Sequence, residues 1–82
     1  MKQFRVEALV RRGLKKERRV TLTVTAPTMD AAYQEAVRAT DRWVQQNIGT
    51  VLPVYPSKHW QRVGRMLVYN GLRTNVSLYV TY

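Results

Sequence analysis

The chain has 82 residues, of which 14 are Lys or Arg and 5 are Asp or Glu, so its formal net charge is +9. It contains no Cys and one His, which excludes a disulfide scaffold, a Cys-ligated zinc site and a multi-His metal site. Without a run of about 18 apolar residues or a secretory signal, we expect a cytoplasmic protein with no membrane partner. The length indicates one domain, residues 1–82, and nothing in the sequence predicts a cofactor.

The positive charge is unevenly distributed along the chain. Residues 1–27 hold eight basic and two acidic residues, residues 28–49 hold two and three, and residues 50–82 hold four and none. The middle segment is therefore the only one with a net negative charge. The surplus lies in the two flanking segments, so an anionic partner is expected there.

The first flank alternates apolar and polar residues with period two, over residues 4–10 and again over residues 20–26. This pattern predicts two strands with one buried face each. Gly13 lies in the stretch between them, so we expect a hairpin with a long tip. Pro27 ends the second strand, because it cannot donate a hydrogen bond to a neighbouring strand.

The middle segment changes to a helical period. From Met29 to Ile48, apolar residues recur at spacings of three and four, which predicts one amphipathic helix of about twenty residues. Thr28 suits the N-cap, and Gly49 suits the left-handed position after the last turn. The polar face carries both signs of charge, so we expect it to be solvated.

Two further runs, residues 59–69 and 72–82, flank Asn70-Gly71 and predict a second hairpin. That dipeptide favours a two-residue type I′ turn. In this register Val63, Leu67 and Tyr69 face the core, and a slip of one residue would exchange the two faces.

The predicted fold is α+β with the order ββαββ, a four-stranded antiparallel sheet with one long helix packed on one face. A single helix covers only one face of such a sheet. The other face and the outer strands are left open, so a homodimer that extends or covers the sheet would be favourable.

The strongest functional signal is the tip of the first hairpin, residues 11–19. Six of its nine residues are basic: Arg11, Arg12, Lys15, Lys16, Arg18 and Arg19. Side chains at a hairpin tip point outward, where Lys and Arg can bind phosphates and release counterions. We interpret this stretch as a nucleic-acid contact. The alternative is a solvated loop in a protein with a basic bias.

The second signal is the open face of the predicted sheet. In the favoured register this face presents five arginines and two aromatic residues: Arg5, Arg11, Arg19, Arg62, Arg73, Trp60 and Tyr79. Aromatic side chains interleaved with Arg form a platform on which unpaired bases can stack. The alternative is that Trp60 and Tyr79 belong to a protein contact, since both residue types are favoured at interfaces.

These signals predict a small DNA- or RNA-binding protein of low sequence specificity, because no recognition helix is present. The alternative is an inhibitor or adaptor whose basic surface docks on an acidic protein partner. In layout and size the chain resembles accessory proteins of phages and mobile elements, including inhibitors of host nucleases.

An enzyme is the third hypothesis. The segment with Arg62, Arg65 and Arg73, which ends in Tyr82, is similar to the tail of RelE-type ribonuclease toxins. That family opens with a strand followed by helices, whereas a hairpin opens this chain. His59 has no carboxylate or second His beside it in the sequence, so we expect no catalytic residues and no enzyme.

Overall fold

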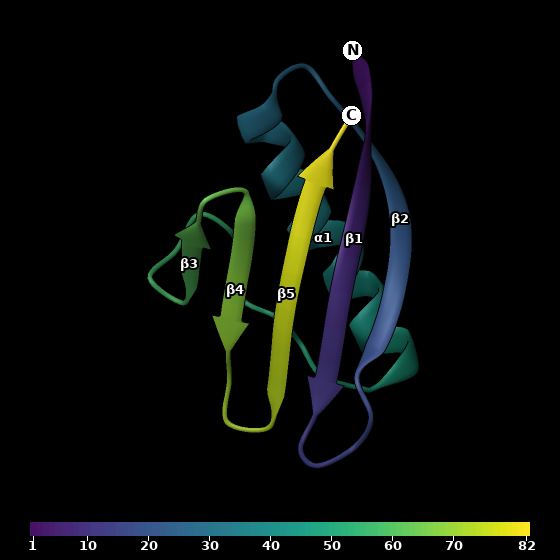
Figure 1. Cartoon of the computed structure of the whole chain (residues 1–82), viewed down its shortest axis with the longest axis vertical. Coiled ribbons are helices and arrows are strands. Elements are labelled where there is room, and N and C mark those ends of the chain that lie inside the picture. The colour runs from purple at the N-terminus through teal and green to yellow at the C-terminus, as the bar shows by residue number, and fades with distance from the viewer.

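The computed structural model describes all 82 residues and contains one five-stranded sheet and one helix. The helix lies behind the sheet in the view of Figure 1. The elements are β1 (Lys2–Arg12), β2 (Arg18–Ala26), α1 (Met29–Asn47), β3 (Trp60–Val63), β4 (Met66–Asn70) and β5 (Thr74–Thr81). All neighbouring strands are antiparallel, in the order β2-β1-β5-β4-β3. The first and last strands of the chain therefore pair in the sheet, and β2 and β3 form its edges.

The α+β class is confirmed, but the predicted four-stranded ββαββ sheet is wrong. Residues 59–69 do not form one strand, because the chain folds back at Gly64-Arg65 and pairs Val63 with Met66. Gly64 has a φ of 61°, and Arg65 does not have a positive φ. Positive φ at the first loop position alone matches a type II′ hairpin turn. The order of elements is thus ββαβββ.

The predicted turn at Asn70-Gly71 is also wrong. Neither residue has positive φ, which a type I′ turn requires at both positions. Asn70 pairs with Asn75 instead, so the loop is longer. Leu67 lies opposite Leu78, four residues beyond the partner that a two-residue turn would give it. An even shift keeps each side chain on the same face, so Leu67 remains in the core as predicted.

Helix α1 begins and ends close to the predicted positions. The Thr28 hydroxyl accepts a hydrogen bond from the Ala31 amide at 3.2 Å, as an N-cap residue should. At the other end Gly49 has a φ of 88°, and its amide donates to the Val44 carbonyl at 2.9 Å. No helix of the protein is both long enough and apolar enough to cross a membrane.

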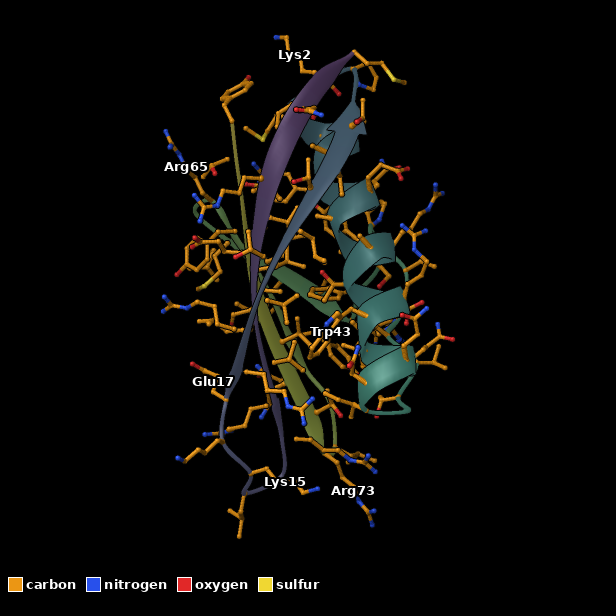
Figure 2. All side chains as sticks on the ribbon, turned by 90° about the vertical axis from the view of Figure 1, so that its right-hand side faces the viewer. Lys2, Lys15, Glu17, Trp43, Arg65 and Arg73 are labelled. Carbon is orange, nitrogen blue, oxygen red and sulfur yellow. The ribbon has the colours of Figure 1, made fainter.

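The core lies between α1 and the inner face of the sheet. Its main members are Phe4, Val6, Ala8 and Val10 of β1, Ala32, Tyr33, Ala36, Val37 and Val44 of α1, Leu67 of β4, and Val76, Leu78 and Val80 of β5. Leu52 and Trp60 extend this core beside the connection between α1 and β3. The outer face of the sheet is left uncovered, as the side view in Figure 2 shows.

Candidate nucleic-acid interface

One end of the molecule carries half of the chain's cations. They come from the β1–β2 hairpin tip and from the loop between β4 and β5: Arg11, Arg12, Lys15, Lys16, Arg18, Arg19 and Arg73. We call these seven residues the basic end; Figure 2 labels Lys15 and Arg73 there. A backbone hydrogen bond of 2.7 Å from the Gly13 amide to the Arg73 carbonyl joins the two loops. Residues 60 positions apart in the sequence thereby form one surface.

The acidic residues of the chain do not neutralise this surface. Glu17 is the one carboxylate of the hairpin tip, and Figure 2 shows it on the side of the sheet away from α1. All three ion pairs lie elsewhere: Arg5–Glu7 at 3.1 Å, Arg38–Glu35 at 2.9 Å and Arg62–Asp30 at 3.6 Å. With seven cations and Glu17, the basic end has a net charge of +6, which is two thirds of the +9 of the whole chain.

Two arginines of the basic end are held against the C-terminal end of α1. An Nη1–H of Arg12 donates to the Ile48 carbonyl at 2.8 Å, and the Arg18 guanidinium lies 6.0 Å from the centre of the Trp43 ring. The last turn of α1 has no basic residue of its own, so Arg12 supplies positive charge to the negative end of the helix dipole. These contacts fix the hairpin to the helix.

The five other side chains are free. Those of Arg11, Lys15, Lys16, Arg19 and Arg73 make no hydrogen bond or ion pair within the protein. Their charges are therefore available to a partner.

Arg12 lines two hollows in the surface of the basic end. A hollow of about 120 Å³ is lined by Val10, Arg12, Lys15, Lys16, Arg18, Asn47 and Ile48. A second, of about 340 Å³, is lined by Arg12, Thr50, Tyr69, Leu72, Arg73 and Thr74. Neither wall contains a carboxylate. Since Arg and Lys donate charge-assisted hydrogen bonds to phosphate oxygens, each hollow has the chemistry of an anion-binding site.

Trp60 does not lie on the open face, contrary to the prediction. Its side chain is 5% exposed, its ring centre is 5.5 Å from that of Tyr69, and its indole N–H donates to the Pro53 carbonyl at 2.9 Å. The turn at Gly64 reverses the chain, so the even-numbered residues of β3 share a face with the odd-numbered residues of β4. Trp60 is therefore a core residue.

Arg62 is on the wrong face in the prediction for the same reason. Its guanidinium lies 4.4 Å from the centre of the Tyr33 ring, and its Nε–H donates to the Gly64 carbonyl at 3.3 Å. Desolvation lowers the pKa of Arg62, but Tyr33, Tyr55 and Asp30 raise it by more, so the net shift of this pKa is upward. Arg62 joins β3 to α1 and is already occupied by protein partners.

The remaining predicted residues of the open face divide into two groups. Arg5, Arg11, Arg19 and Tyr79 do lie on that face, although Arg5 is paired with Glu7. Arg73 lies in the β4–β5 loop and belongs to the basic end instead. With Trp60 buried, one aromatic residue is left on this face, so the predicted stacking platform is not assembled.

The open face carries an apolar patch that the sequence interpretation missed. It consists of Leu9, Val63, Met66, Val68 and Tyr79, which are exposed or partly exposed. Tyr79 lies opposite Met66, which lies opposite Val63, so three of them form a row across β5, β4 and β3. Val63 was predicted to face the core, and the Gly64 turn places it here.

Neither a protein-family model, nor a curated protein, nor a solved structure matches this chain. No three His, Cys, Asp or Glu side chains lie together where they could hold a metal ion. The geometry and charge of the basic end are therefore the evidence for function.

Proposed function

We propose that this protein binds DNA or RNA through its phosphates, with low sequence specificity, and that the basic end is the contact surface. The observation that carries this proposal is the concentration of seven cations in two hydrogen-bonded loops, with Glu17 as the one nearby carboxylate. Concentrating unpaired cations at a protruding tip creates self-repulsion. Phosphates relieve that repulsion, and binding gains further from the release of counterions.

The two kinds of cation in the basic end suit different tasks. Arg12 and Arg18 are held by Ile48 and Trp43, so their planar guanidinium groups are oriented before a ligand arrives. Lys15 and Lys16 have no partner and can adjust to a phosphate at varying positions. This combination supports binding along a regular backbone.

The helix supports the expectation of low specificity. The polar face of α1 carries both signs of charge, with Arg38 paired to Glu35 and Gln45 donating to Asp41. Its apolar face packs on the sheet and its outward face has no surplus of positive charge, so α1 lacks the features of a recognition helix for a major groove. Contacts to phosphates alone do not distinguish base sequences.

The experiment that tests this proposal is a salt titration. The affinity of the protein for a labelled duplex and a labelled single strand is measured by fluorescence anisotropy between about 50 and 200 mM salt. With about five phosphate contacts, we expect the affinity to fall on the order of several hundredfold across this range. Failure to bind any nucleic acid at the lower salt concentration would overturn the proposal.

The apolar patch of the open face favours one second candidate, an adaptor that docks on an acidic protein. The patch is bordered by Arg11 and Arg19, with the Arg5–Glu7 ion pair beside it, so a partner with an apolar centre and acidic groups facing these two arginines would be complementary. A pull-down after nuclease treatment separates the candidates. An acidic protein that is retained by the wild type and lost with Val68→Asp, but not with Lys15→Glu/Lys16→Glu at the hairpin tip, would support the adaptor.

A further inference from the structure

Two leucines are fully exposed at the basic end. Leu14 lies at the β1–β2 hairpin tip and Leu72 lies in the β4–β5 loop, and both are as exposed as side chains in an extended chain. A single exposed leucine is common on protein surfaces. Here, however, two occupy neighbouring loops joined by the Gly13–Arg73 hydrogen bond, and cations flank both.

The sheet fixes the spacing between these loops. One loop connects β2 with β1 and the other connects β5 with β4, and these four strands are consecutive in the sheet. The centres of the loops are thus two strand spacings apart, roughly 10 Å. Both loops leave the sheet at the same end, as Figure 1 shows. Base pairs in duplex DNA rise by about 3.4 Å, so the loops span about three base-pair steps.

We propose that Leu14 and Leu72 are a pair of wedges that insert between stacked base pairs of duplex DNA and kink it. Arg12, Lys15 and Arg73 would bind the phosphates beside the opened steps. This inference rests on the proposed function and assigns its ligand as a DNA duplex.

The shape of the loops points to the minor groove. That groove is about 6 Å wide, so the leucine side chains at the two loop tips can enter it while the strands behind them stay outside. Proteins that bend DNA from the minor groove insert apolar side chains, leucine among them, between base steps. Arginine and lysine around the wedge also match the negative potential of a narrow minor groove.

An anionic membrane would also attract cations beside exposed leucines, but the structure fits it less well. Even a single myristoyl chain gives only marginal membrane binding, and two leucine side chains bury less apolar surface than that. Leu14 is followed directly by Lys15 and Lys16, which would have to approach the hydrocarbon together with it. In duplex DNA the phosphates line the groove on either side of the base steps, so leucines and neighbouring cations both find partners.

The test compares Leu14→Ala/Leu72→Ala with the control Val51→Ala/Val54→Ala, which removes exposed apolar side chains from the connection after α1. Unstacking is read from a fluorescent base analogue within the duplex, and bending from energy transfer between dyes at its ends. Wild type and control should increase the analogue fluorescence several-fold and shorten the end-to-end distance. The leucine variant should lose both signals, with affinity reduced by less than about tenfold because the phosphate contacts remain.

Each outcome separates this inference from the proposed function. If the wild type binds duplex DNA without unstacking it, or if the leucine variant unstacks it equally well, the wedge is overturned and the proposed function stands. If the wild type binds no nucleic acid, both are overturned. The last arm measures how much wild-type protein and how much leucine variant is retained on vesicles of phosphatidylserine and phosphatidylcholine. Retention that depends on the leucines, with DNA bending unaffected by them, would identify a membrane contact instead.

Discussion

The β1–β2 hairpin has strands of 11 and 9 residues, whereas the β3–β4 hairpin has strands of 4 and 5. Both contain cations that the sequence suggests for nucleic-acid binding. The long hairpin extends to the end of α1, and the side chains of Lys15 and Lys16 have no partner. The short hairpin lies within reach of the first turn of α1, so Arg62 contacts Tyr33 and Asp30. The comparison teaches that position relative to α1 matters: Lys15 and Lys16 at the hairpin tip have no protein partner, whereas Arg62, beside the start of the helix, is held by Tyr33 and Asp30.

The largest predicted effect is a loss of stability when a buried residue of the β3–β4 hairpin is replaced. Replacing Trp60 with Ala removes a buried indole that packs on Tyr69 and donates to Pro53. We expect the free energy of unfolding to fall by about 3–5 kcal/mol, measured by urea denaturation. Affinity for nucleic acid, measured where the variant is still folded, should be unchanged. A stable Trp60→Ala variant that had lost its affinity would show that this tryptophan stacks on bases.

A smaller effect is expected from replacing one arginine in each hairpin, Arg62 or Arg19, and comparing melting temperature and affinity. Arg62→Ala removes contacts with Tyr33, Asp30 and Gly64, so we expect a modest decrease in melting temperature and an affinity within about twofold of the wild type. Arg19→Ala removes a side chain without partners, so it should leave the melting temperature unchanged and weaken binding. Thermal denaturation and anisotropy on the same two variants check this, and the reverse pattern would contradict the comparison.

The sequence predicted the long hairpin and the helix because each has an uninterrupted period. Alternation over residues 4–10 and 20–26 specifies one buried face, and the helical spacing from Met29 to Ile48 specifies one stripe. These patterns also place the hairpin tip, so six residues of the basic end could be found without a structure.

The second half was less predictable because residues 66–69 are apolar on both sides of the strand. Their pattern hides the turn at Gly64-Arg65, although a glycine followed by a polar residue inside such a run is a signal for a type II′ turn. Missing that turn put Trp60 and Arg62 on the wrong face. The position of Arg73 depends on β5 pairing with β1, a contact between the two ends of the chain that no local pattern encodes.

The central claim is that the location of the charge, and not its total, carries the function. Two double variants test it: Lys15→Glu/Lys16→Glu in the basic end, and Lys2→Glu/Arg42→Glu, which replaces exposed cations outside it. Figure 2 labels Lys2 at the opposite end of the molecule. Both variants lower the net charge from +9 to +5. Circular dichroism establishes that both are folded, and anisotropy gives their affinities for a DNA duplex at about 50 mM salt.

We predict that Lys15→Glu/Lys16→Glu lowers the affinity by more than about tenfold and reduces the slope of log affinity against log salt by about two. Lys2→Glu/Arg42→Glu should lower the affinity by less than about threefold, since it acts only through the long-range field. Equal losses in the two variants would show that nucleic acid responds to the overall charge and would contradict the assignment of the basic end as the binding surface.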